Sequence, residues 1–283
     1  MKEKENITRR EPISIIGISC RFPGNAHSPQ QFWELLCEGV DAIREVPPER
    51  WHHEAFYSAN PQSPGKTVTR HGGFLQNIDE FDPTFFGISP REAAFIDPQQ
   101  RLLLELAHEA FEDAGIRWQS LQARNTGVFV GIFIHDYQHI LLRDRTTLGA
   151  HTGTGVAMSL AANRISYCFN FQGPSVALDT ACSSSLVAVD QACKALRNND
   201  CDYAIAGGVN VILGPDNTIA RSKANMLSED GRCKEEQAWF YCNDKRRQFS
   251  KIIIAMPTFS VLALIQMVNP KVSQYPMGKH KRA

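Results

Sequence analysis

Short apolar runs alternate with helix-length segments through the middle of the chain, and this alternation limits the possible folds more than any other feature. Runs with strand character occupy residues 126–134, 175–179 and 203–213. Segments with helical spacing lie between them, at residues 156–169 and 183–196. Parallel strands need such crossover helices, and they are apolar throughout because both faces of a parallel sheet are covered. The sequence therefore predicts an α/β fold around a mainly parallel, buried sheet.

Three further elements are expected before this region. The Ile-rich run over residues 12–20 predicts a buried strand, and residues 30–38 have the spacing of a short helix. The clearest helix covers residues 97–115, with Asp97 as its N-cap and Pro98 in its first position. Its apolar residues share one face, namely Leu103, Leu106, Ala107, Ala110, Phe111 and Ala114.

Charge and composition exclude two classes of protein. The chain has 30 basic and 30 acidic residues, and 43% of its residues are hydrophobic. A nucleic-acid-binding domain normally carries a basic surplus, and a disordered chain combines low hydrophobicity with high net charge. We therefore expect a folded protein that binds no nucleic acid.

The cysteines indicate a reducing compartment. The charged N-terminus is followed by only a short apolar run, so no secretory signal is predicted. No C-x-x-C pair occurs, which argues against a zinc ribbon or a redox pair. We expect a cytoplasmic protein with free thiols, most of them inert core residues. The eight cysteines are Cys20, Cys37, Cys168, Cys182, Cys193, Cys201, Cys233 and Cys242.

Cys182 has a setting that no other cysteine shares. A short strand ends at Asp179, and a helix is predicted to begin at Ser183. Unpaired backbone N–H groups and the positive end of the helix dipole favour a thiolate there, and the same N–H groups can hold an oxyanion. From spacing alone, a structural cysteine beside a serine-rich helix cap is an equally good interpretation. The predicted apolar face of this helix comprises Leu186, Val189, Cys193 and Leu196.

Several stretches of the chain resemble the β-ketoacyl synthase family, specifically the condensing domains of modular polyketide synthases and multifunctional fatty acid synthases. They cover residues 11–234 almost without gaps and follow the family order. Thiolases and chalcone-type synthases also use a cysteine at the position of Cys182. The stretches over residues 11–24 and 159–175 favour the carrier-protein-dependent branch of the family. The stretches are EPISIIGISCRFPG (11–24), FFGISPREAAFIDPQQRLLLELAHEAFEDAGI (85–116), GVFVGI (127–132), SLAANRISYCFNFQGPS (159–175), DTACSSSL (179–186), AGGVNV (206–211) and MLSEDGRCK (226–234).

The resemblance implies a thiolase-like fold with layered α/β/α/β/α architecture in two similar halves, and a homodimer. It implies that Cys182 is the nucleophile and that its backbone N–H supplies part of the oxyanion hole. The cysteine would take an acyl group from the phosphopantetheine of an acyl carrier protein. Condensation with malonyl-carrier protein follows in the intact family. Neither a metal nor a bound cofactor is implied.

After Lys234 the family pattern stops. The expected continuation, with two histidines and a lysine for decarboxylation, is replaced by an unrelated sequence, so we expect the first half of the fold to be present and the second half to be missing. Acylation of Cys182 is then the most that this chain could perform. The alternatives are a non-catalytic fragment that dimerises or binds a carrier protein, and an inactive broken gene product.

The two ends of the chain have their own character. Residues 1–10 form a charged N-terminal extension. Residues 1–234 contain 22 basic and 27 acidic residues, whereas residues 235–283 contain 8 and 3. Within this tail, residues 252–268 are mostly apolar and reach the lower limit of a membrane span. A shifted reading frame or retained intron explains the tail best, with a membrane anchor or a replacement that caps the half-fold as alternatives.

Two histidine motifs are weaker candidates. The HTGTG sequence at residues 151–155 resembles the family's catalytic-histidine motif, but it precedes the cysteine, so we do not expect His151 to be catalytic. His135 and His139 could share one helix face, yet without a third ligand they predict no zinc site.

Overall fold

The computed structural model describes residues 12–232 and 262–268. The predicted N-terminal extension (residues 1–10) and most of the predicted tail lie outside the described residues. So do Cys233 and Cys242.

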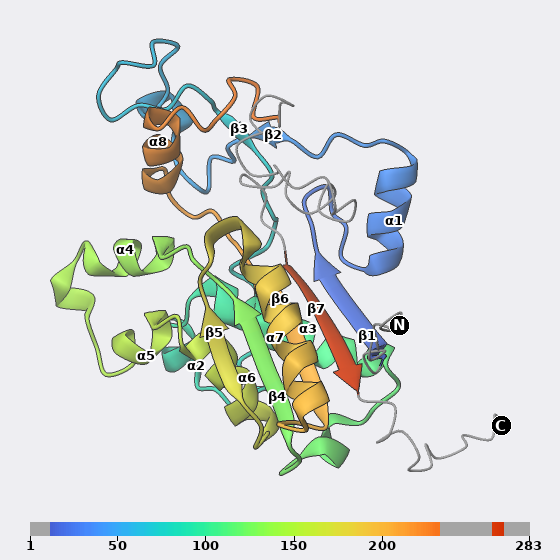
Figure 1. Cartoon of the computed structure of the whole chain (residues 1–283). Helices are drawn as coiled ribbons and strands as arrows, with labels where there is room; N and C mark the ends of the chain where they lie inside the picture. The colour runs from blue at the N-terminus through green and yellow to red at the C-terminus, as the bar shows by residue number, and fades with distance from the viewer. Residues whose placement is uncertain (1–11, 233–261, 269–283) are drawn as a thin grey trace, which may run out of the picture.

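One five-stranded sheet organises the molecule (Figure 1). Strands β4, β5 and β6 pair in parallel, as the alternating pattern predicted. Strand β7 runs antiparallel to both of its neighbours, β1 and β6, so the sheet is mixed and has one reversed strand. The order across the sheet is β1 (Ser14–Arg21), β7 (Leu262–Val268), β6 (Tyr203–Val209), β4 (Thr126–Gly131) and β5 (Ser175–Leu178).

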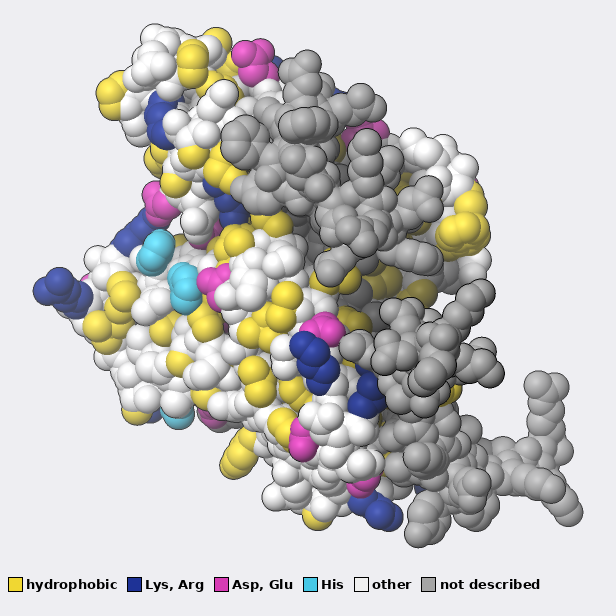
Figure 2. Space-filling view, viewed as in Figure 1, with side chains coloured by type: hydrophobic (Ala, Val, Ile, Leu, Met, Phe, Trp, Pro, Cys, Tyr) yellow, Lys and Arg dark blue, Asp and Glu magenta, His cyan; other side chains and the backbone are white. Residues whose placement is uncertain are grey.

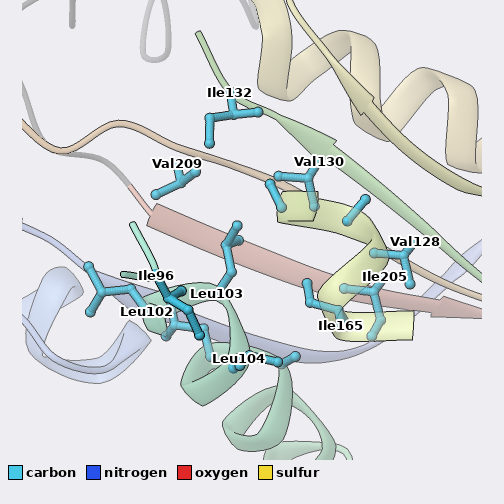
Figure 3. Close-up of a cluster of buried hydrophobic side chains, with 14 of the residues drawn as sticks. Ile96, Leu102, Leu103, Leu104, Val128, Val130, Ile132, Ile165, Ile205 and Val209 are labelled. Carbon is cyan, nitrogen blue, oxygen red and sulfur yellow. The ribbon is translucent and has the colours of Figure 1, made fainter. Parts of the chain in front are cut away.

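Helices cover both faces of this sheet. Helix α7 (Ser184–Asn198) packs on β4 and β6 from one side, and α3 (Pro98–Asp113) and α6 (Leu160–Phe169) pack from the other. The main core lies between the sheet and this second pair of helices (Figure 3). It buries the side chains of Leu103, Leu104, Val128, Val130, Ile165 and Ile205.

The ends of α3 follow the predicted signals. The carboxylate of Asp97 accepts a hydrogen bond from the N–H of Gln99 at 2.8 Å, and Pro98 occupies the first helical position. Gly115, just after the helix, has a φ of 65°, a conformation that costs glycine little. The remaining elements are smaller. They are α1 (Pro29–Cys37), β2 (Arg44–Glu45), β3 (His71–Gly72), α2 (Pro90–Ala93), α4 (Asp136–Leu142), α5 (Thr152–Val156) and α8 (Asp216–Lys223).

Three predicted elements are shorter than expected. The strand predicted over residues 126–134 ends at Gly131. The strand predicted to reach residue 213 ends at Val209, because side chains then replace the sheet as hydrogen-bond partners: Val211 N–H donates to Gln99 Oε1 at 3.2 Å. The helix predicted over residues 156–169 begins only at Leu160, as α6, and Val156 is the last residue of α5. Ala157 between them is extended, and its carbonyl accepts a hydrogen bond from Gln100 Nε2 at 3.2 Å.

Strand β7 comes from the segment that the sequence assigned to an unrelated tail. It lies inside the sheet, and Met267 is 2% exposed in the small core between the sheet and α7. Its sulfur lies 3.9 Å from Cys193 Sγ. The membrane-anchor interpretation does not fit residues 262–268, which form a strand, while residues 252–261 lie outside the described residues. Among the helices that the structure describes, none has the length and apolar character needed to cross a bilayer.

Two glycines allow α7 to approach the sheet closely. Gly131 of β4 and Gly208 of β6 are direct partners in the parallel register. A Cβ on Gly131 would lie 2.5 Å from the backbone carbon of Ser184, and one on Gly208 would lie 2.6 Å from Cβ of Ser185. The first turn of α7 therefore packs directly against the backbone of β4 and β6 at these two glycines.

This contact also corrects the predicted face of α7. The side chains turned to the sheet are small, because the helix lies too close for larger ones. Leu186 is 38% exposed, and Val189 and Cys193 are half-buried. The buried residues of α7 are Ser184, Ala188, Ala192, Ala195 and Leu196, so only Leu196 of the predicted set is buried.

We predict that Met267→Ala lowers the free energy of unfolding by about 2–5 kcal/mol, because it removes a fully buried side chain from the core beneath α7. Met226→Ala is the matched control, since Met226 is 39% exposed and its loss should change stability by less than about 0.5 kcal/mol. Urea denaturation of the full chain measures both. Equal effects of the two substitutions would show that β7 is not packed in the sheet.

We predict that Gly131→Ala destabilises the chain by about 1–3 kcal/mol, because the new methyl group meets the backbone of Ser184. Gly153→Ala should have the opposite sign, a gain of about 0.5–1 kcal/mol, because Gly153 lies in helix α5 and a Cβ there meets no atom within 4 Å. Thermal and urea unfolding compare the two variants. A neutral Gly131→Ala would contradict the close contact.

Candidate active site

Cys182 lies in the turn between β5 and α7, as predicted. The strand ends at Leu178, a single 3₁₀ turn covers Ala181–Ser183, and α7 begins at Ser184. The Cys182 side chain is exposed. The sequence therefore places a free thiol at the N-terminal end of a 15-residue helix.

The side chains around Cys182 hold this turn in place. The carboxylate of Asp179 accepts the N–H of Ala181 at 2.8 Å. The hydroxyl of Ser184 accepts the N–H of Thr180 at 2.9 Å and donates to the carbonyl of Ala181 at 2.7 Å. Ser183 Oγ donates to the carbonyl of Thr180 at 2.9 Å. The alternative role of the serines, a side-chain cap for α7, is not found: Ser183 at the N-cap makes no capping hydrogen bond, and Ser183 and Ser184 bond to the turn that precedes the helix.

The backbone just before Cys182 is strained. Ala181 has a φ of 55°, in the left-handed region that side chains rarely adopt. For a residue with a Cβ this conformation costs roughly 1–2 kcal/mol. Ala181 is held in this conformation because its N–H donates to Asp179 and its carbonyl accepts from Ser184. The backbone direction at Cys182 is therefore set by its neighbours.

The backbone N–H of Cys182 has no acceptor among the residues that the structure describes. The N–H groups of a helix's first turn likewise lack partners within the helix. These donors, together with the positive end of the α7 dipole, favour a negatively charged atom at this point. This geometry is compatible with the oxyanion role predicted for Cys182.

The other described cysteines differ from Cys182. Burial raises the pKa of each of the thiols Cys20, Cys168 and Cys201 to about 11, and it also raises the pKa of Cys193. These four fit the predicted role of inert core residues. Cys37 does not, because it is exposed. It stands at the last position of α1, the opposite end of a helix from the setting of Cys182.

None of the histidine motifs forms a metal site among the residues described. His135 and His139 are both exposed at the start and middle of α4. No group of three His, Cys, Asp or Glu side chains within residues 12–232 and 262–268 could hold a metal ion. His151 precedes α5, and its ring lies 6.3 Å from that of Phe95.

The surface beside Cys182 is partly apolar. Leu186 of α7 and Val176 of β5 are 38% and 39% exposed. On the face where α7 lies, hydrophobic side chains are spread among polar ones, and the charged groups stand in small separate sets of both signs (Figure 2).

Sequence comparison with known protein families supports the assignment that the motifs suggested. The family model described as "Beta-ketoacyl synthase, N-terminal domain" matches residues 10–239. The chain is 48% identical over 228 residues to a phenolphthiocerol/phthiocerol polyketide synthase of Mycobacterium tuberculosis, covering 81% of this chain and 12% of that protein. It is 49% identical over 223 residues to a second phenolphthiocerol/phthiocerol polyketide synthase chain from the same organism, covering 79% and 14%. The chain thus spans a small part of the length of these relatives.

Solved structures agree with the sequence matches. The oxazolomycin ketosynthase domain of Streptomyces albus superposes with a TM-score of 0.80 at 37% identity, covering 93% of this chain and 43% of that one. A ketosynthase from module 6 of the bacillaene synthase of Bacillus subtilis gives a TM-score of 0.77 at 33% identity, covering 93% and 41%. The predicted thiolase-like α/β fold is confirmed for its N-terminal half. The chain belongs to the β-ketoacyl synthase family, whose N-terminal domain it matches over most of its length.

Proposed function

We propose that Cys182 accepts an acyl group from a thioester on the phosphopantetheine of an acyl carrier protein. The observation that carries the proposal is the exposed thiol at the N-terminal end of α7, in a turn held by Asp179 and Ser184. Family membership supports it, because the chemistry of the family begins with acyl transfer to this cysteine.

The step is a thioester exchange. The Cys182 thiolate attacks the carbonyl carbon, and the electrons of the C=O bond move to oxygen, where the Cys182 N–H donates a hydrogen bond to the oxyanion. The oxyanion then collapses, the bond from carbon to the pantetheine sulfur breaks, and that sulfur leaves as a thiolate and takes up a proton. The acyl group remains on Cys182 as a new thioester.

The proposal for this chain is confined to acylation. Condensation with a malonyl thioester needs groups that generate and hold a carbanion. In the family that the sequence resembles, two histidines and a lysine that follow the cysteine supply them. Residues 235–283 contain one histidine, His280, so this chain alone does not provide the pair.

The sheet edge supports a homodimer as part of the proposal. Strand β5 lies at one end of the sheet and pairs with β4 alone among the described strands. The other side of an edge strand leaves backbone N–H and C=O groups available to a second chain. Exposed Val176 on β5 adds apolar surface at the same place.

We predict that an acyl N-acetylcysteamine thioester, which mimics the end of phosphopantetheine, acylates Cys182 of the full chain. Intact-mass and peptide mass spectrometry should show one added acyl group on the peptide that contains Cys182. Cys182→Ser should remove at least about 90% of the labelling, because a serine hydroxyl is a far weaker nucleophile at neutral pH.

Cys37→Ser is the matched control, because Cys37 is the other exposed cysteine but stands at the C-terminal end of a helix. Labelling should be unchanged in that variant. Equal acylation of Cys37 and Cys182 would contradict a formed site and favour the non-catalytic binding fragment. If the folded chain is not acylated at all, the result would likewise contradict a formed site and favour the non-catalytic binding fragment.

We predict that iodoacetamide at pH 8 modifies Cys37 and Cys182 well before Cys20, Cys168 and Cys201. The buried thiols have pKa values of about 11, so few of them are ionised at pH 8, and the core also shields them. Raising the pH towards 11 should increase their reactivity. In urea this difference should disappear. Fast labelling of the three buried thiols in the native chain would show an open core.

A further inference from the structure

A cavity of about 580 Å³ lies away from Cys182, on the side of the sheet that α3 covers. One wall is the outer face of α3. The opposite wall is the loop of residues 75–86, and the end of β1 closes one side through Arg21. Leu75 and Leu102, both buried, form its apolar floor.

Negative charge is concentrated in this cavity, although the chain as a whole is neutral. On α3, the acidic residues recur at spacings of three and four, so they share one helical face. The only basic side chain in the lining, apart from His27 and His108, is that of Arg21. The five lining carboxyl groups are those of Glu80, Asp82, Glu105, Glu109 and Glu112.

The protein's own basic side chains pair with two of these five carboxyl groups, and among the remaining three only Glu105 is half-buried, since Glu80 and Asp82 are exposed. Arg21 forms a two-point ion pair with Glu109, and His108 Nε2 lies 3.5 Å from Glu112 Oε1. Nearby Arg101 donates instead to the carbonyl of Asp79. The half-buried carboxyl of Glu105 has neither an ion pair nor a hydrogen bond among the described residues.

Three aromatic rings, those of Phe81, Phe85 and Phe86, line the same cavity as this carboxyl group. Phe85 is 54% exposed, and its ring centroid lies 4.8 Å from that of His108 and 4.9 Å from that of Phe86. Phe86 in turn stacks on Phe81 at 5.4 Å. An exposed aromatic face next to unpaired negative charge is the combination by which proteins recognise organic cations.

We propose that this cavity binds an organic cation, a guanidinium or primary ammonium group on a short apolar chain. The cation lies against Glu105 and Phe85, and the apolar chain lies on the floor formed by Leu75 and Leu102. The source is either a small free organic cation or an arginine or lysine side chain of a protein segment, and both present the same chemistry.

Protonation of Glu105 gives the site a distinctive pH response. Burial raises the pKa of Glu105 to about 7, Glu109 and Asp82 act in the same direction, and Arg21 and Arg101 oppose them. A bound cation favours the ionised carboxylate, so affinity should rise as the pH rises through 7. Between pH 6 and pH 8 the ionised fraction, and with it the affinity, changes by roughly tenfold. His27 and His108 are the other titratable basic side chains that line the cavity beside Arg21.

The test is a titration of the ¹⁵N-labelled full chain, followed by NMR. The probes are butylguanidinium and N-acetyl-arginine N-methylamide, with N-acetyl-citrulline N-methylamide as the neutral isostere. We expect saturable shifts at residues 76–86 and 105–112 with the cations and none with citrulline. Binding of both cations points to a protein side chain as the natural source, and binding of butylguanidinium alone points to a small free organic cation.

Variants separate the proposed site from general surface charge. Glu105→Gln keeps the shape of the side chain and should weaken binding about tenfold or more, with loss of most of the pH response. Phe85→Leu should weaken it about threefold. Glu38→Gln, an exposed change outside the cavity, should leave it unchanged. Equal binding of the citrulline probe, unchanged affinity in Glu105→Gln with its amide spectrum intact, or no saturable shift with either cation would overturn the proposal.

Discussion

The contact between α7 and the sheet determines where the candidate nucleophile lies. Gly131 and Gly208 face each other across two parallel strands, and the first turn of α7 rests on them. A side chain at either position would push this turn outwards. Because Cys182 directly precedes the turn, its position relative to the sheet depends on the absence of two side chains rather than on any contact of its own. The hydrogen bonds from Asp179 and Ser184 then set the local direction of the backbone.

Much of this arrangement could be predicted from the sequence because it rests on local signals. The Asp97–Pro98 start of α3 is a short-range pattern, and so is the strand–cysteine–helix order around Cys182. The buried face of α7 could not be predicted in the same way. Periodicity selects the largest apolar residues, whereas the close approach of the helix selects the smallest ones. Two glycines on strands that are distant in sequence cause this, and no window along the helix contains them.

Strand β7 shows a second limit of local patterns. An apolar run such as residues 252–268 fits a buried strand, a buried helix or a short membrane span equally well. The position between β1 and β6 in the sheet determines that residues 262–268 form a strand, and those two neighbours are separated by most of the chain. Residues 262–268 pair with both strands along their length, and so satisfy backbone groups on two sides at once. Hence the identity of this segment is a property of the whole sheet and not of its own composition.

The helices on the two faces of the sheet differ in the side chains that they turn towards it. On the face of α7, small residues turn inwards and leave Leu186 outside, so apolar surface remains exposed beside the nucleophile. On the other face, α3 buries its large apolar residues and turns an acidic row outwards. The outer side of α7 carries the exposed ion pair of Lys194 with Asp190. Helix α3 needs only one apolar side to cover the sheet. Its outer side is thus free to carry charge, and this is where the unpaired carboxyl of Glu105 lies.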